Sequence, residues 1–336
     1  MPRISKVTLA KIALPIVTLG MCLLMTEVVA RVLFSRTTLN LGLEMWKYAK
    51  DVKLRSADPE IGHRHRPNAQ AQLMGVDVKT NSLGLRDVER AIPKPADVYR
   101  IVVLGDSITF GWGVAFEHTF CQVLERKLNQ NPPIPGKRFE VVNTGVGNTN
   151  TSMEVRYFEA EGYKLEPDLV LLAWFINDAE PTPVPTENWL AYHSYAYTWI
   201  TSMVDEVRRN NDKQVGWQDY YRGLYADSQP GWGKSQKAIA DLASFCKDKR
   251  IPCRVFLIPE LHTVGPKYEF ADVHAKVAAV CAAAGLPVLE LLDAFPAEQD
   301  PRKWWVSPGD AHPNGDGEEL MGERLDRALR EEQWVH

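Results

Sequence analysis

Several residue types and patterns are scarce in this 336-residue chain, and each scarcity excludes a class of protein. The net charge is only −4, so no surface for binding nucleic acid is indicated. Internal repeats and low-complexity tracts are absent from the sequence. The five cysteines are too few for a disulfide framework and lack the paired CxxC spacing of a zinc site. They are Cys22, Cys121, Cys246, Cys253 and Cys281, and the pattern favours buried free thiols over a Cys246–Cys253 pair.

Long apolar runs are also scarce, and one lies near the N-terminus. Ile12 to Thr26 carries no charge, and the apolar stretch from Val7 to Phe34 is long enough to cross a bilayer. Lys11 can reach one interface, and Glu27 and Arg31 share one helical face, where they can neutralise each other. Residues 1–35 are therefore predicted to form a cytoplasmic tip and a transmembrane signal anchor.

Two other interpretations of this segment fit less well. A cleaved signal peptide needs small residues where the charged pair lies, and a lipoprotein signal needs a small residue in place of Met21.

The positive N-terminus places that end in the cytoplasm and the rest of this single-pass protein outside it, in the periplasm of a bacterium. Basic residues also follow the span. Glu27 either binds a partner helix or lies at the interface.

Beyond a linker or N-terminal extension at 36–98, strands and helices alternate in a domain at 99–332. Apolar strands are predicted at 100–105, 139–143, 168–175, 252–259 and 287–292, and helices at 119–129, 152–163, 233–249, 272–284 and 315–331. An aromatic-rich insertion at about 180–232 interrupts the pattern. Near-continuous apolar strands that alternate with helices predict an α/β fold with a central parallel sheet of about five strands, covered on both faces.

Polar residues follow these strands at the edge where such sheets place their sites. Ser107 lies after the first strand, in Leu104-Gly-Asp-Ser-Ile-Thr-Phe-Gly111, and is either a nucleophile or a simple helix cap. Asp310 and His312 lie in a polar loop before the last helix. We expect His312 to take the Ser107 proton, while Asp310 orients the imidazole and stabilises its cation.

Two further loops offer hydrogen-bond donors for an oxyanion hole. The segment 143–151 follows the second strand and can donate a backbone N–H, and Asn177 follows the third strand and can donate its side-chain amide. Each loop is weak support alone, because Asn and Gly are common in loops.

These segments together resemble the SGNH (GDSL) hydrolases, from about Arg100 to Glu331. Gly105-Asp106-Ser107 matches the nucleophile block, Asn177-Asp178 the Asn-Asp block and Asp310-x-His312 the final block. The resemblance implies a flavodoxin-like three-layer α/β/α domain without a metal or organic cofactor. It also implies an oxyanion hole formed by the Ser107 N–H, a backbone N–H of the second block and the Asn177 amide.

The sequence departs from this family at three places. Asn148 occupies the usual glycine of the second block, so the donor is Asn148, which tolerates left-handed geometry, or Gly147. The Asn-Asp block usually reads Gly-x-Asn-Asp, and Phe175 replaces its glycine here. The usual Asp-x-x-His is Asp310-x-His312, a spacing that also occurs among membrane-associated members that act on polysaccharide acetyl groups. The stretches 81–86, 259–262 and 305–312 look like that anchored group.

Several other residues are candidates for substrate binding. Asp106 and Asp178 belong to the matched blocks; His262, with Glu260, follows the fourth strand; and Arg86 lies in a turn outside the core domain. For His262 a structural or solvated role is the alternative, and for Arg86 a surface salt bridge. The aromatic insertion is expected to form a cap with some substrate contact, or an interface with a membrane partner. His63 and His65 are predicted to lie in a solvated loop, without a metal.

Three functions compete at this point. The first is a serine esterase that acts on O-acyl groups, most plausibly O-acetyl groups of a carbohydrate or cell-envelope polymer. The second is an O-acetyltransferase that works with a membrane-protein partner. The third is a non-catalytic subunit of a membrane complex that keeps the fold. A Ser107 that lacks contact with His312 would favour the third.

Overall fold

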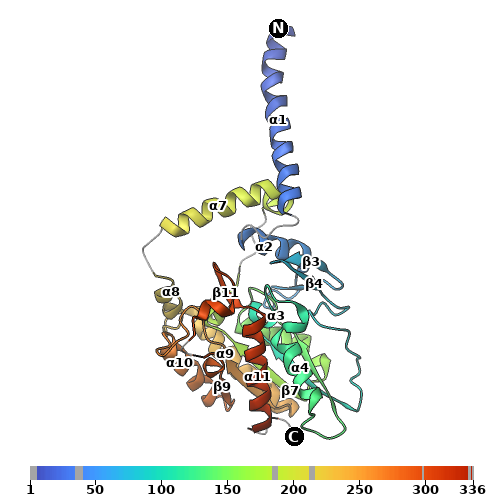
Figure 1. Cartoon of the computed structure of the whole chain (residues 1–336), viewed down its shortest axis with the longest axis vertical. Helices are drawn as coiled ribbons and strands as arrows, with labels where there is room; N and C mark the ends of the chain where they lie inside the picture. The colour runs from blue at the N-terminus through green and yellow to red at the C-terminus, as the bar shows by residue number, and fades with distance from the viewer. Residues whose placement is uncertain are drawn as a thin grey trace. The chain divides into compact units, whose positions relative to one another are not determined.

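The structure is a computed structural model that describes residues 6–34, 41–183, 188–211, 216–296, 299–331 and 334 (Figure 1). The chain divides into two compact units. The smaller comprises Met1–Lys50 and Pro185–Lys213, and the larger comprises Asp51–Val184 and Gln214–His336.

The larger unit is built on one parallel sheet, so the predicted fold is confirmed. Its strands lie in the order β6-β5-β7-β8-β9, and every neighbouring pair is parallel. They are β5 (Val98–Leu104), β6 (Arg138–Asn143), β7 (Leu169–Trp174), β8 (Cys253–Leu257) and β9 (Val288–Glu290). Counted along the chain, this is the 2-1-3-4-5 order of flavodoxin-like folds.

Both faces of the sheet are covered, because its strands are apolar on both sides. All seven residues of β5 are buried, and alternate residues point into two separate cores: Val102 and Leu104 into one, Ile101 and Val103 into the other. The first core is completed by α5 (Thr151–Ala160), α9 (Pro230–Lys249) and α10 (Ala271–Ala283). The second is completed by α4 (Phe120–Gln130) and α11 (Gly315–Glu331), which lie side by side (Figure 1). The result is the predicted three-layer arrangement.

Short elements add to this framework. Three antiparallel pairs are β1 (Lys53–Arg55) with β2 (His63–His65), β3 (Gln70–Leu73) with β4 (Val76–Lys79), and β10 (Trp305–Ser307) with β11 (Asp310–Pro313). Short helices are α3 (Ser107–Phe110), α8 (Trp217–Leu224), η1 (Tyr48–Val52), η2 (Phe116–His118), η3 (Gly162–Leu165), η4 (Ile176–Ala179), η5 (Leu292–Ala294) and η6 (Pro301–Trp304).

The prediction of a solvated loop at His63 and His65 was wrong. The segment pairs with β1 as a strand, and His65 is buried against Phe110, with ring centroids 5.1 Å apart. Burial lowers the pKa of His65 to about 3, and that of His63 to about 4. Both imidazoles are therefore neutral parts of the fold at neutral pH.

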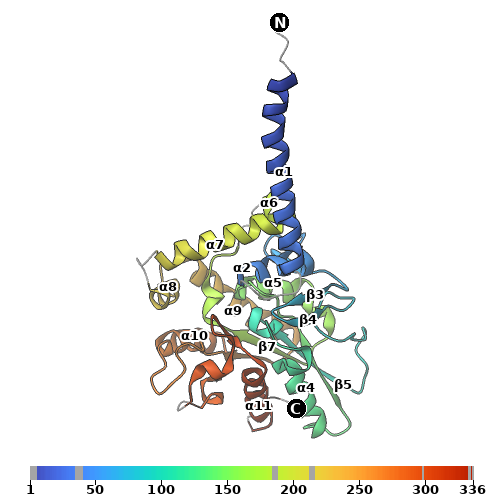
Figure 2. The same cartoon turned by 45° about the horizontal axis from the view of Figure 1, so that its top comes forward.

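The smaller unit contains α1 (Lys6–Phe34), α2 (Leu41–Lys47), α6 (Trp189–His193) and α7 (Tyr195–Asn211). Lys11–Leu33, with a mean hydropathy of 2.1, is the one stretch in the described part of the chain that is long and apolar enough to cross a membrane. Helix α7 runs across the end of α1 (Figure 2). Glu27 of α1 joins the two helices, because its carboxylate accepts hydrogen bonds from Ser194 Oγ and from the backbone N–H groups of Tyr195 and Ala196.

Candidate active site

Ser107 lies at the point where the chain order of the sheet reverses, directly beyond the end of β5. In open parallel sheets this switch point is the usual position of a binding crevice. Ser107 does not cap α3, because the N-cap is Asp106, whose carboxylate accepts from the Ile108 N–H. Ser107 Oγ instead lies 2.8 Å from Nε2 of His312, although the two residues are 205 positions apart.

His312 is held by Asp310 on the same strand, β11. Its Nδ1 lies 2.6 Å from Asp310 Oδ1, and its backbone N–H donates to the same oxygen at 3.1 Å. Because Nδ1–H donates to the carboxylate, Nε2 is left as the acceptor for the Ser107 hydroxyl. The other oxygen, Oδ2, accepts from the indole Nε1–H of Trp112 at 3.1 Å. Sequence reasoning missed Trp112, since a tryptophan after Gly111 carries no motif signal.

The surroundings adjust the pKa values of this pair in opposite directions. Burial on its own lowers the pKa of His312, but the hydrogen bond and charge of Asp310, followed by the charges of Asp106 and Glu260, outweigh it and raise the pKa. Burial raises the pKa of Asp310, yet its hydrogen bond to His312 outweighs this effect and holds the pKa below its usual value. The geometry thus favours an ionised Asp310 beside an imidazole that readily takes a proton.

The loop after β6 approaches the same edge. Asn148 has a left-handed backbone with φ of 64°, the conformation that glycine usually supplies, and no described residue accepts a hydrogen bond from its N–H. The neighbouring Gly147 carbonyl is bound to Nε2 of His63 at 3.1 Å. Gly145 packs so tightly that an added Cβ would lie 2.4 Å from the backbone N of Phe110. This contact fixes the loop against α3.

Asn177 lies in η4, after β7. Its Nδ2 donates to Asp106 Oδ2 at 2.8 Å, which leaves the second amide hydrogen available, and Asp178 accepts from the Phe175 N–H. Asp106 and Asp178 are buried behind the serine rather than exposed to a cavity. They were candidates for substrate binding, but their contacts are with the protein's own backbone and with Asn177.

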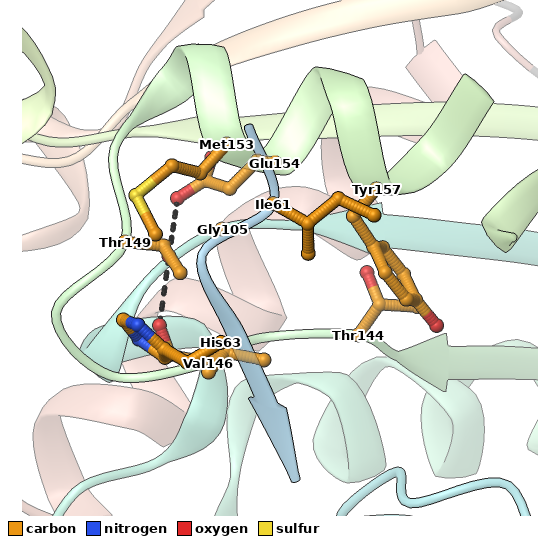
Figure 3. Close-up of a pocket in the computed structure, with 9 residues that line it drawn as sticks. All are labelled: Ile61, His63, Gly105, Thr144, Val146, Thr149, Met153, Glu154 and Tyr157. Atoms are coloured by element: carbon orange, nitrogen blue, oxygen red, sulfur yellow. Dashed lines mark hydrogen bonds between the residues drawn. The ribbon is translucent and has the colours of Figure 1, made fainter. Parts of the chain in front are cut away.

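A third buried carboxyl, Glu154 of α5, lies near this pair. Burial, followed by repulsion from Asp106, raises the pKa of Asp178 well above its ordinary value. Burial, followed by repulsion from Asp178 and Asp106, does the same for Glu154, and burial also raises the pKa of Asp106. Figure 3 shows Glu154 beside a narrow cavity of about 10 Å³ that His63 also lines. Thr149 donates a hydrogen bond to Glu154 there. These buried carboxyls thus lie behind the loops that follow β6 and β7.

Arg86, another predicted substrate contact, lies elsewhere. It is 1% exposed, and its guanidinium donates to the carbonyl groups of Phe110, Gly111 and Val114. The side chain therefore braces the turn after α3. Arg86 is buried within the fold and does not line the cavity beside His312.

A cavity of about 290 Å³ opens beside His312, and His262 reaches it as the sequence suggested. Trp217 and Tyr221 of α8, from the aromatic insertion, form part of its wall. The remaining lining residues are Ile108, Phe175, Ile176, Glu260, Gly309, Asp310 and Ala311. Within the described part of the chain, no group of three or more His, Cys, Asp or Glu side chains could hold a metal ion.

A doubly wound parallel sheet with a serine, histidine and carboxylate in contact at its switch point is an arrangement of hydrolytic enzymes. A family model described as the GDSL-like lipase/acylhydrolase family matches residues 103–320. The chain belongs to this family of hydrolases. A search of curated proteins gave no match.

Solved structures with similar folds are distant in sequence. A lipolytic protein of the G-D-S-L family from Desulfitobacterium hafniense is 18% identical, with a TM-score of 0.41, over 68% of this chain and 99% of that one. A two-domain esterase active on acetylated mannans is 16% identical (TM-score 0.45; 70% and 49% covered). A lipase/acylhydrolase from Enterococcus faecalis is 16% identical (TM-score 0.42; 70% and 96% covered).

Proposed function

We propose that this protein is a serine esterase that removes O-acyl groups, most plausibly O-acetyl groups, from a carbohydrate or cell-envelope substrate. The observation that carries the proposal is the continuous contact from Ser107 Oγ to His312 Nε2, at 2.8 Å, and from His312 Nδ1 to Asp310, at 2.6 Å. A neutral serine needs such a base to become a nucleophile. The cavity beside His312, about 290 Å³, is at the small end of ligand pockets.

The reaction follows from these contacts. His312 Nε2 takes the hydroxyl proton as Ser107 Oγ bonds to the ester carbonyl carbon. The resulting oxyanion collapses, the bond to the alcohol oxygen breaks, and His312 gives its proton to that oxygen. Water then attacks the acyl-enzyme and yields a proton to His312; this proton returns to Ser107 Oγ as the acid leaves. Asp310 stays ionised throughout and stabilises the imidazolium.

The oxyanion would be stabilised by three donors. The Ser107 N–H has no hydrogen-bond partner among the described residues, and neither has that of Asn148; the free hydrogen of Asn177 Nδ2 is the third donor. The left-handed backbone of Asn148 favours it over Gly147 as the donor of the second block.

An O-acetyltransferase is the second candidate, since it shares every step up to the acyl-enzyme and differs only in the final acceptor. Helix α1 supports it, because an apolar N-terminal helix would hold the enzyme near a membrane-protein donor. We infer that α1 is a single-pass anchor with a cytoplasmic N-terminus and an extracytoplasmic catalytic unit. The Ser107–His312 contact disfavours the third candidate, an inactive subunit.

Kinetics on acetyl esters test this proposal. The purified protein should hydrolyse p-nitrophenyl acetate and acetylated sugars, and Ser107→Ala and His312→Ala should each lower kcat by about 10³-fold or more. Transfer would appear as acetylated product when a sugar acceptor is added. A well-folded wild type that is inactive on all of these esters would contradict the proposal.

A further inference from the structure

A second histidine–carboxylate pair faces the cavity beside His312. Glu260 and His262 repeat the local geometry of Asp310 and His312: the histidine Nδ1 lies 2.5 Å from Glu260 Oε1, and its backbone N–H donates to Oε2 at 2.9 Å. Both residues line the same cavity as His312. Glu260 and His262 are not part of the proposed oxyanion hole, so their position at the cavity needs a separate explanation.

The contact with Glu260 fixes the chemistry that His262 can offer. Because Nδ1–H donates to the carboxylate, the neutral ring presents Nε2 as an acceptor. No described residue donates to this Nε2, and the side chain is 41% exposed. A lone-pair acceptor needs an O–H or N–H donor from the substrate. An ester or ether oxygen cannot supply one, but the hydroxyl of a polyol can.

The surroundings of His262 suit a sugar ring. The imidazole contacts two indoles, with ring centroids 5.2 Å from Trp217 and 4.5 Å from Trp305. Aromatic faces of this kind can stack on the C–H face of a sugar, while one polar group fixes its orientation. The Glu260 segment is also held from behind, since its backbone N–H donates to Tyr268 Oη, and Tyr268 contacts the buried His274.

The position relative to His312 identifies which half of the ester lies here. His312 must give its proton to the leaving alcohol oxygen, so that oxygen lies beside Nε2 of His312, at the mouth of this cavity. The carbonyl oxygen points instead toward Ser107 N–H and Asn177. We propose that Glu260, His262 and Trp217 form an alcohol-side subsite, in which His262 Nε2 accepts a hydrogen bond from a free hydroxyl next to the ester. This inference rests on the proposed esterase function.

Substrates with and without free hydroxyls test the subsite. The readout is the ratio of kcat/KM for glucose monoacetate to that for glucose pentaacetate, which has no hydroxyl. His262→Asn keeps a donor at the Nδ1 position but has no atom at Nε2, and should lower this ratio about three- to tenfold, the effect of one hydrogen bond. His262→Gln, with an amide at the Nε2 position, should recover part of it. The matched control is His118→Asn, at an exposed residue that does not line the cavity.

The outcomes separate the two proposals. An unchanged ratio in His262→Asn, in a protein whose Ser107 still reacts with a fluorophosphonate, overturns the subsite alone. A wild type that hydrolyses p-nitrophenyl acetate but prefers the pentaacetate does the same. A wild type that reacts with no ester and no fluorophosphonate overturns the esterase function, and the subsite with it.

A different observation concerns the smaller unit, where large apolar side chains are exposed on α6 and α7. Ile200, Met203, Val204 and Val207 follow the i, i+3, i+4, i+7 spacing of one helical face. Trp189, Leu190 and Tyr192 add exposed apolar surface on α6. The opposite side of α7 faces inward, since Thr198 is buried. An apolar stripe with Trp and Tyr beside it is typical of helices at a membrane interface.

Glu27 fixes the depth at which α7 meets α1. The uncharged run ends there, and Lys11 to Glu27 is about 24 Å of helix at ~1.5 Å per residue. With Lys11 extended toward headgroups, this nearly matches a hydrocarbon core of about 30 Å. We propose that α6 and α7 lie in the membrane–water interface, with this apolar stripe in the lipid, and that Glu27 pairs with α7 rather than with a partner helix.

Labelling with a polarity-sensitive dye tests this placement in the full chain, in vesicles of phosphatidylcholine and phosphatidylglycerol. The four other cysteines are buried, so Cys22 alone should react and will report whether α1 inserts. In a Cys22→Ser background, Met203→Cys and Val207→Cys should be quenched by brominated lipid. Ser202→Cys, about 100° further round the helix from Met203 and away from the stripe, should not be.

Failure to quench at 203 and 207 while Cys22 is quenched overturns the interfacial placement alone. An apolar dye environment at position 203 without quenching would mean that protein covers the stripe, and would also overturn the interfacial placement. A Cys22 label that is not quenched would overturn both the membrane anchor and the interfacial placement.

Discussion

Asp310 accepts hydrogen bonds from His312 and Trp112, and its main effect on the site is on the pKa of His312. Its hydrogen bond and charge raise the pKa of His312 against the effect of burial, so this pKa should fall when they are removed. Asp310→Asn should therefore reduce kcat/KM on p-nitrophenyl acetate by roughly 10²- to 10⁴-fold. The acid limb of the pH profile, where His312 loses its proton, should also move to lower pH. A limb that moves upward, or a full rate at the plateau, would contradict the role of Asp310.

Trp112 is a positioning residue, since it contacts Asp310 and does not line the cavity. Trp112→Phe keeps the bulk but removes the indole donor, and should lower kcat roughly tenfold at unchanged KM, because a hydrogen bond to a charged group is lost. Steady-state kinetics on one ester measure both constants. Trp189→Phe, at an exposed residue on α6, is the matched control. A change in KM alone would indicate a role in binding instead.

The candidate site could be predicted from sequence only where position along the strands defined it. Ser107 and Asn177 follow strand ends, so a parallel sheet brings them to one edge. Asp310 and His312 lie on β11, between the last strand of that sheet and α11. Arg86 was not predictable, because its three acceptors are backbone carbonyls that no side-chain pattern reveals. Trp112 was missed for a similar reason: its partner lies 198 positions away.

Among the elements, α4 and α11 are joined by a buried carboxyl. Glu318 Oε2 accepts from the Phe120 N–H at the start of α4, and burial raises the pKa of Glu318 to about 8. The folded state thus holds a proton that the unfolded chain releases near pH 4.5. Stability from this group is complete below pH 4.5 and is lost as the pH rises toward 8.

Glu318→Gln should remove that part of the pH dependence. The difference in urea midpoint between variant and wild type should move in favour of the variant from pH 5 to pH 9, because only the wild type must bury a charge. Urea titrations at both pH values, followed by tryptophan fluorescence, would measure it. A constant difference would show that Glu318 is ionised in the folded protein.

The loop after β6, residues 143–151, needs a glycine at position 145 to pack against α3. Gly145→Ala places a Cβ against the backbone of Thr109 and Phe110, which cannot rotate away, and should destabilise the catalytic unit by about 1–3 kcal/mol. Gly223→Ala on α8 is the control, because its Cβ would meet nothing within 4 Å. Thermal unfolding of both variants would measure the difference, and equal melting temperatures would contradict the packing account.

Sequence periodicity predicted the main elements well and the short ones poorly. The strand expected at 168–175 is β7, Leu169–Trp174, and the helix expected at 315–331 is α11 with the same bounds. Long apolar runs define such elements. The β3–β4 hairpin was not foreseen, since its turn depends on Met74 and Gly75, both with positive φ, and methionine rarely takes that conformation.

At the scale of the whole molecule, the chain combines a larger catalytic unit with a smaller unit. The smaller unit is formed by the N-terminal segment and by a segment inserted within the sequence of the larger unit. Residues 188–211 leave the α/β pattern and fold with α1 and α2. The aromatic-rich insertion predicted at about 180–232 therefore contributes to both units. Trp217 and Tyr221 line the cavity beside His312, whereas Trp189 and Tyr192 belong to the smaller unit.

The central claim is that His312 activates Ser107 for attack on an ester. Its most direct test is the intact mass and peptide map of the full-length protein after incubation with a fluorophosphonate. The account predicts one adduct, on Ser107, which is absent in Ser107→Ala and forms far more slowly in His312→Ala. A folded wild-type protein without an adduct, or with equal labelling in His312→Ala, would contradict it.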